Sequence, residues 1–311
     1  MKHIVLVTYG EPTSPSFVEQ LVYSWRILLG LTRTVADIPA PLIPVIALSR
    51  ARGRNAMWRD NNYSSPLEPI TLAQATQLGN ALARRSDDKW QIHVAYEFRE
   101  PLLSTMIRRL PRDEAVIVAP MYAADSAFTH ALSRTTVEAL DPRRPAPIVV
   151  LPPIDVDQLA SASAHHVMHN INSEENDRNP ATALVLAAHG TLLKPAKPID
   201  TGLEATEKLR LGIENRLAAS FGMVQNGWLN HSRGGKWTDP PIEEALKRVN
   251  DAGYRDVVYY PYGFLADNAE TQLEGQLAVQ AFPNLRVRFI PCLNGSPELA
   301  ELLASQVLSV H

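Results

Sequence analysis

Eight short runs of strand-forming residues, separated by longer amphipathic segments, organise the hydrophobic and polar positions of this chain. Most are continuously apolar, as in strands buried on both faces of a parallel sheet, and one alternates apolar with polar residues. The runs are 4–9, 90–98 (alternating), 116–122, 146–151, 184–189, 224–229, 257–262 and 285–290. Helical spacing of apolar residues fills much of the remainder. This order predicts an α/β protein with parallel sheets flanked by helices.

The strand ends repeat along the chain. The first run ends in Tyr9-Gly10 and the fifth in His189-Gly190, while the third and seventh runs are closed by proline followed by aromatic residues. We therefore expect two similar α/β halves that face one another, each with four strands. We set the N-terminal domain at residues 1–155, completed by a C-terminal helix at 297–311, and the second domain at 156–296.

Helices are predicted at 17–29, 71–84, 126–140, 159–170, 201–221, 237–252 and 297–310, with a further one that opens around 265–274. The proline-rich segment 37–44 is not expected to be a regular helix, because proline lacks the N–H group and clashes with the preceding turn. It is interpreted as the lip of a pocket or as a surface loop. Residues 173–180 are expected to be a polar linker, and 230–236 a polar loop.

The strand end at His189 is the strongest candidate for chemistry. In open α/β sheets, ligands bind at the carboxyl ends of the strands. An imidazole there can accept a proton near neutral pH. The alternative is a buried histidine that bonds a backbone carbonyl.

Other groups near strand ends add to this picture. Asp267, Glu270 and Glu274 follow the seventh strand and share one side of a helix, where they can either bind a divalent cation or complement the helix dipole. Tyr9 can face a crevice and ligate iron or bond a substrate, or lie in the core. Arg26 can bind a carboxylate.

A second histidine group lies on the predicted helix 159–170. His165 and His169 are one turn apart and share a face, which is a spacing that can bind a metal. No carboxylate or cysteine partner is evident in the sequence, so a solvated helix surface is favoured.

Composition narrows the function classes. The chain has 311 residues, a net charge of −3 and one cysteine. A slightly negative net charge provides no basic surface of the kind that binds nucleic acid. A single cysteine excludes a disulfide framework and a four-cysteine iron–sulfur cluster. Without a secretory signal or a membrane-length apolar run, we expect a cytoplasmic protein. Neither a phosphate-binding glycine loop nor a Gly-x-Ser-x-Gly elbow is present.

Six motifs in order resemble the ferrochelatases, which insert ferrous iron into porphyrins. They are Val7-Thr8-Tyr9-Gly10-Glu11-Pro12, Tyr63-Ser64-Ser65-Pro66-Leu67-Glu68-Pro69-Ile70-Thr71, Leu186-Ala187-Ala188-His189-Gly190, Trp237-Thr238-Asp239-Pro240, Gly263-Phe264-Leu265-Ala266-Asp267-Asn268-Ala269-Glu270-Thr271 and Asn294-Gly295-Ser296-Pro297. The resemblance implies two Rossmann-like domains, each a parallel four-stranded sheet flanked by helices, with a chelatase-like porphyrin cleft between them.

The resemblance also implies residue roles. His189 and Glu270 are implied as the catalytic pair on one face of the macrocycle, and both, with Tyr9 and Glu274, as groups that contact the metal. Porphyrin contacts are implied for Tyr9, Arg26, Ser65, Tyr122 and Trp237. Tyr9 and Arg26 match the branch that uses coproporphyrin. Fe(II) is then a substrate, haem or coprohaem the product, no resident cofactor or iron–sulfur cluster is required, and a monomer is expected.

The chain departs from the family pattern at three places. Asn268 stands where the family has histidine, Glu97-Phe98 replaces a basic pair, and Pro120-Met121-Tyr122 keeps only part of a longer motif. A chelatase for another metal such as cobalt, or a non-catalytic haem or porphyrin carrier, are the alternatives.

Overall fold

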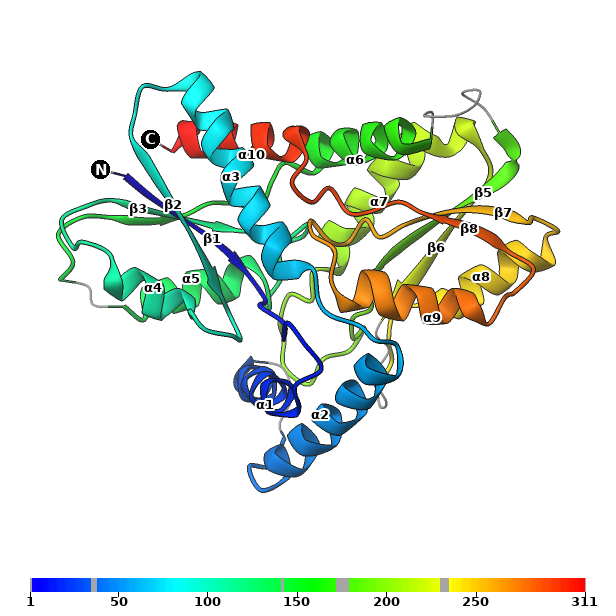
Figure 1. The fold of residues 1–311 in the computed structure, drawn as a ribbon, viewed down its shortest axis with the longest axis horizontal. Helices are drawn as coiled ribbons and strands as arrows, with labels where there is room; N and C mark the ends of the chain where they lie inside the picture. The colour runs from blue at the N-terminus through cyan, green and yellow to red at the C-terminus, as the bar shows by residue number, and fades with distance from the viewer. Residues whose placement is uncertain (1, 35–37, 141–142, 172–178, 230–234, 311) are drawn as a thin grey trace.

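A computed structural model describes residues 2–34, 38–140, 143–171, 179–229 and 235–310. It contains two parallel four-stranded sheets that lie side by side (Figure 1). The N-terminal sheet has the order β2-β1-β3-β4. Its strands are β1 (Lys2–Thr8), β2 (Trp90–Tyr96), β3 (Val116–Pro120) and β4 (Ile148–Val150).

The C-terminal sheet repeats this arrangement with the order β6-β5-β7-β8. Its strands are β5 (Asn179–His189), β6 (Phe221–Leu229), β7 (Asp256–Tyr260) and β8 (Arg286–Phe289). In each sheet the first strand pairs in parallel with the second and the third. The predicted fold class is therefore confirmed, and both halves have the same topology.

Helices cover both faces of the sheets (Figure 1). They are α1 (Phe17–Thr34), α2 (Leu42–Asp60), α3 (Leu67–Arg85), α4 (Leu103–Arg109), α5 (His130–Glu138), α6 (Val156–Ile171), α7 (Leu203–Leu217), α8 (Ile242–Asp251), α9 (Gly275–Gln280) and α10 (Pro297–Ser309). A 3₁₀ turn at Ala218–Ser220 follows α7, and a π-helical segment, η2 (Glu270–Glu274), runs directly into α9.

The central strands are buried on both faces, which explains their continuous apolar pattern. On β1, Ile4 and Leu6 face one cluster of the core, whereas Val5 and Val7 face another. β5 alternates in the same way. A strand covered by helices on both faces has no solvent side, so it carries no polar alternation.

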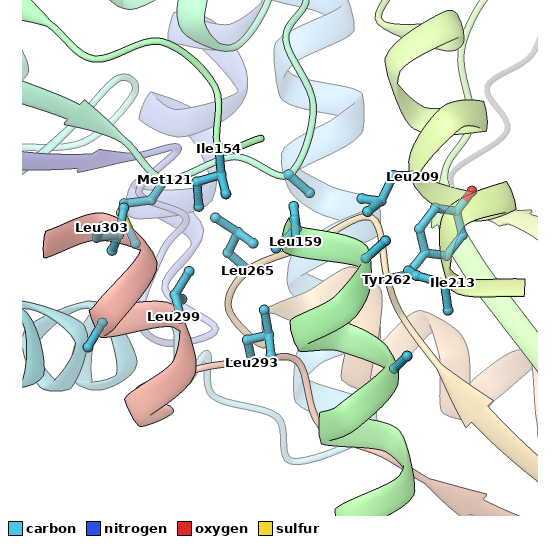
Figure 2. Close-up of a cluster of buried hydrophobic side chains, with 14 of the residues drawn as sticks. Met121, Ile154, Leu159, Leu209, Ile213, Tyr262, Leu265, Leu293, Leu299 and Leu303 are labelled. Carbon is cyan, nitrogen blue, oxygen red and sulfur yellow. The ribbon is translucent and has the colours of Figure 1, made fainter. Parts of the chain in front are cut away.

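One hydrophobic core joins the two halves. The cluster that contains Ile4 of β1 also contains Leu186 of β5, and helices α3, α6, α7 and α10 complete it. Figure 2 shows Leu159 of α6 between Leu299 and Leu303 of α10 on one side and Leu209 of α7 on the other. The halves therefore share buried apolar surface rather than meeting only at a linker.

The expectation for the proline-rich segment 37–44 is wrong at its C-terminal end. Helix α2 begins at Leu42, so Pro44 lies in its first turn. The first N–H groups of a helix have no partner within it, and proline is tolerated there. Residue 37 of this segment, residues 173–178 of the predicted linker and residues 230–234 of the predicted loop lie outside the described part. The last two residues of that linker, 179 and 180, belong to strand β5.

The C-terminal helix α10 packs against the first half, since Arg84 and Arg85 of α3 both bond Glu301. It also packs against α6 through the shared core. The domain boundaries proposed at 155/156 and 296/297 stay a prediction. In the described residues, none of the helices is both long and apolar enough to cross a bilayer.

Candidate active site

A cavity of about 330 Å³ lies at the carboxyl ends of both sheets. The N-terminal half lines it with residues that follow its strands, including Tyr9 and Tyr122, and the C-terminal half with His189 and Gly263. This volume falls within the range of small-molecule sites, and the position is the one that open α/β sheets use for ligands. Helix α1 adds Tyr23, and the polar groups stand among mainly apolar side chains.

His189 and Glu270 meet in this cavity although they are far apart in the sequence. His189 is the last residue of β5, and Glu270 is the first of η2. The Nδ1 atom of His189 lies 2.8 Å from Oε2 of Glu270. Nearly half of the His189 side chain, 48%, stays accessible, so the imidazole is paired but not sealed off.

The neighbouring carboxylates of Glu270 and Glu274 raise the pKa of His189. Burial lowers this pKa, but the charge of Glu270, its hydrogen bond to the imidazole and the charge of Glu274 together outweigh that effect. The pKa of Glu274 is raised, first by burial and then by the charge of Glu270. The pair therefore binds a proton more readily than an isolated histidine would.

Close approach of two backbones forms this end of the cavity. The N–H group of Gly263, in the turn after β7, donates to the carbonyl of Ala187 at 3.3 Å. A Cβ atom added at Gly263 would lie 2.9 Å from Cα of Ala188. Only glycine fits so near a neighbouring strand, which explains why a glycine follows the aromatic residues there.

Aromatic side chains form the opposite wall. The ring of Tyr9 stacks on Phe98 at 6.1 Å between centroids, and it meets Tyr122 at 4.7 Å. The pKa of Tyr9 is raised, chiefly by burial and next by the charge of Glu270. Tyr9 is therefore a neutral phenol in this state. Near it, the hydroxyl groups of Thr8 and Tyr122 are buried without a hydrogen-bond partner.

The structure brings some of the predicted residues to the cavity and not others. His189, Glu270, Tyr9, Tyr122 and Trp237 line it. Glu274, Ser65 and Arg26 are not among the lining residues.

Arg26 is engaged elsewhere. Its guanidinium group donates to Oε1 of Glu100 at 3.0 Å and to the carbonyl oxygen of Phe98 at 3.3 Å. These bonds hold helix α1 against the turn after β2. A contact between Arg26 and a substrate carboxylate would require this pair to open.

Ser65 lies outside the cavity lining and holds Glu11, which lines the cavity, through a hydrogen bond. Its hydroxyl group donates to Oε1 of Glu11 and accepts from the N–H group of Leu67 at the start of α3. Glu11 lines the cavity, and burial raises its pKa to about 7, against the opposing hydrogen bond from Ser65.

Arg50 and Arg54 line the cavity and were not assigned to the site from the sequence. They lie one turn apart on α2, and the guanidinium carbon of Arg54 stands 4.9 Å from the centroid of the Tyr23 ring. The Nη1 atom of Arg54 is buried without a partner. Their four-residue spacing was a usable signal, but the proline-rich start of α2 obscured the helix.

Asn268 and Glu97, which depart from the family pattern, both form specific hydrogen bonds in the structure. Oδ1 of Asn268 accepts from the N–H groups of Glu270 at 2.9 Å and Thr271 at 3.3 Å, so this asparagine caps the segment that carries Glu270. Glu97 is partly buried and accepts a hydrogen bond of 2.7 Å from the hydroxyl group of Ser133. Burial raises the pKa of Glu97 to about 7, against the Ser133 bond.

Asp267 does not extend the acidic surface of the cavity. Its carboxylate accepts from the N–H group of Cys292 at 3.1 Å and from the side-chain amide of Asn294 at 2.8 Å. It thereby fixes the turn that precedes α10, which is a structural task.

The histidines of α6 lie away from the cavity. The rings of His165 and His169 are 6.2 Å apart, and Nδ1 of His165 is 3.5 Å from Glu298 of α10, a carboxylate neighbour that the sequence did not reveal. His166 contacts the carbonyl of Pro291. Across the described ranges, no three histidine, cysteine, aspartate or glutamate side chains are grouped to hold a metal ion.

Comparisons with known proteins point to one family over nearly the whole chain. The family profile described as ferrochelatase matches residues 2–310. The ferrochelatase of Brucella canis is 27% identical over 98% of this chain and 90% of its own length. That of Geotalea daltonii is 27% identical over 99% of this chain and 97% of its own length.

Solved structures agree on the fold. CbiX, described as the terminal enzyme for biosynthesis of siroheme in denitrifying bacteria, aligns with a TM-score of 0.55 and 15% identity over 100% of both chains. SirB from Bacillus subtilis, solved with Fe³⁺, aligns with a TM-score of 0.53 and 14% identity over 99% of this chain and 95% of its own. At such low identity these matches support the architecture alone.

Proposed function

The chain belongs to the ferrochelatase family, and from this premise we propose that it is a lyase of haem biosynthesis that inserts Fe(II) into a porphyrin, with coproporphyrin III preferred over protoporphyrin IX. The observation that carries the proposal is the convergence of His189 and Glu270, 2.8 Å apart, in one cavity at the carboxyl ends of both sheets. No resident cofactor is needed, because Fe(II) is the substrate. A monomer in the cytoplasm is the proposed working form.

Insertion exchanges two protons for one metal ion. The free porphyrin carries two pyrrole N–H groups in its plane, and both protons must leave before Fe(II) occupies the centre. An ionised Glu270 only accepts hydrogen bonds, so Nδ1 of His189 carries the proton between them. The neutral imidazole then keeps Nε2 as an acceptor for a pyrrole proton.

Glu270 stabilises the imidazolium that forms. Its negative charge is the largest influence that raises the pKa of His189, after burial has lowered it. An adjacent carboxylate thus makes the histidine a stronger base because it stabilises the protonated imidazole. Glu274 lies one helical turn further along and also favours the charged imidazole, which suits a role in holding protons or guiding Fe(II).

The opposite wall limits how the macrocycle is held. In the proposed complex, Tyr9, whose ring stacks on Phe98, contacts the macrocycle on the face opposite His189 and meets the metal with its hydroxyl group. A cavity that favours a bent ring over a flat one would expose the pyrrole lone pairs and lower the barrier to metal entry.

Arg50 and Arg54 are the proposed partners of the porphyrin carboxylates. Both line the cavity, and guanidinium groups bind carboxylates through paired hydrogen bonds. The preference for coproporphyrin rests on the resemblance at Tyr9 and on the larger number of carboxylates that this porphyrin presents. Turnover of the two porphyrins, measured side by side under identical conditions, tests the preference.

Replacement of His189 is the central test. His189→Ala should reduce the rate of Fe(II) insertion by about 100-fold or more, because general-base contributions reach that size. Porphyrin binding, followed by absorption, should persist because the remaining cavity wall is unchanged. Activity close to that of the unaltered chain would remove the central assignment.

Two alternatives are separated by simple assays. A chelatase for another metal such as cobalt would prefer that metal when Fe(II) and Co(II) compete for the same porphyrin. A non-catalytic carrier would bind haem tightly but insert no metal. The open, paired imidazole favours a chelatase, since a carrier needs no proton acceptor.

A further inference from the structure

Glu11 connects the two walls of the cavity. It lies in the turn after β1, two residues beyond Tyr9, and lines the cavity. Its two carboxylate oxygens lie 3.1 and 3.3 Å from the backbone nitrogen of Ala269. Ala269 directly precedes Glu270, so one side chain of the N-terminal half bonds the backbone beside the proposed catalytic pair.

The start of the Glu270 segment depends on this contact. The N–H groups of residues 268, 270, 271 and 272 all find acceptors within the segment itself. The N–H group of Ala269 instead donates to Glu11. Ala269 is buried, with 6% of its surface accessible, so water is a poor substitute for the carboxylate.

Other contacts fix Glu11 and the same segment. Ser65 donates to Glu11 and is itself held by the N–H group of Leu67. Trp58 of α2 is fully buried against Ala269 and Leu273. The N-terminal half therefore grips the Glu270 segment through both a hydrogen-bonded carboxylate and an apolar side chain.

We propose that Glu11 is a positioning residue, whose carboxylate clamps the Glu270 segment to the turn after β1 that carries Tyr9. This clamp sets the distance between the protein side chains that contact the two faces of the bound porphyrin. This inference rests on the proposed function. The clamp requires a side chain long enough to extend from the turn after β1 to the N–H group of Ala269. A glutamine keeps that reach and one acceptor, whereas an aspartate keeps the charge but is shorter by one methylene group.

The test compares Glu11→Ala, Glu11→Gln and Glu11→Asp in steady-state Fe(II) insertion. Glu11→Ala should lower kcat by roughly 10- to 100-fold with little change in KM, because small misplacement of catalytic groups is costly while most porphyrin contacts remain. Glu11→Gln should recover most of the rate and Glu11→Asp little of it. Ser65→Ala should fall between the unaltered chain and Glu11→Ala. The matched surface control is Glu204→Gln, at an exposed position in the first turn of α7.

Hydrogen exchange provides a readout that does not need activity. Amides of residues 268–274 should exchange at least several-fold faster in Glu11→Ala, with β5 unchanged. Unchanged exchange, an unaltered kcat, or an aspartate variant more active than the glutamine variant would each overturn the clamp. Absence of Fe(II) insertion by the unaltered chain would instead refute the proposed function, and exchange alone would then decide the clamp.

Discussion

At the scale of single residues, the site is a set of opposed charges in a mainly apolar cavity. Glu270 pairs with His189, and the guanidinium groups of Arg50 and Arg54 lie on the wall that α2 provides. Burial lowers the pKa of Arg50, and the charge of Arg54 lowers it further. Two guanidinium groups held close together disfavour each other, so an anionic substrate group between them would be stabilised.

The pKa of His189 gives a prediction with a definite sign. Because it is raised in the folded chain, protonated His189 stabilises the fold at low pH, and this contribution is lost as the pH rises through the folded-state value. Glu270→Gln removes the charge that does most to raise it. The imidazole of that variant should therefore titrate at lower pH in histidine-selective NMR.

Glu274→Gln provides the comparison, since its charge acts on His189 more weakly. A smaller shift in the same direction is expected. A shift to higher pH in either variant would contradict the proposed electrostatics of the pair.

At the scale of elements, the site residues lie where strands end and helices begin. β5 ends at His189, and the turn after β7 passes so close to it that Gly263 has no room for a side chain. Asn268 then caps the segment that begins at Glu270. A histidine at this position in the family pattern is thus replaced by a residue with a strong capping preference.

Asn268→Ala should cost about 1 kcal/mol of stability, because it removes the acceptor for two N–H groups at a helix start. Chemical denaturation followed by circular dichroism measures this. Asn268→Ser keeps a capping oxygen and should lie within a few tenths of a kcal/mol of the unaltered chain. Equal losses in the two variants would show that the cap contributes nothing.

At the scale of the whole molecule, one core spans both sheets. Leu303 of α10 is 2% exposed and lies in the cluster that joins β1 to β5 (Figure 2). The two halves also meet at the cavity, where Glu11 reaches Ala269. A shared core on one side and a clamp on the other oppose independent movement of the halves.

Leu303→Ala should destabilise the chain by about 2–5 kcal/mol, as expected for a buried leucine that leaves a cavity. Because the core is shared, both halves should unfold in one transition at a lower temperature. Leu72→Ala, at a position that is 53% exposed, is the matched control and should change stability by less than about 0.5 kcal/mol. Calorimetry that resolves two separate transitions would argue against a common core.

The sequence by itself determined the local pattern. Seven mainly apolar runs and one alternating run predicted the eight strands, because strands buried on both faces need continuous hydrophobicity and half-buried strands alternate. The repeated strand endings predicted two halves, which the common strand order bears out. His189 and Glu270 were predicted from their positions after strands and from the family motifs.

Tertiary structure alone decided which distant groups meet. Three predicted site residues bond other side chains instead of lining the cavity: Arg26 bonds Glu100, Ser65 bonds Glu11, and Asp267 bonds Asn294. Arg50 and Arg54 line the cavity from α2, a helix whose proline-rich start hid it from the sequence analysis. These outcomes depend on partners far away in the sequence, and a side chain's direction is set by its packing and hydrogen bonds. Local periodicity carries no record of such partners, so the contact of Glu11 with Ala269 could only be found in three dimensions.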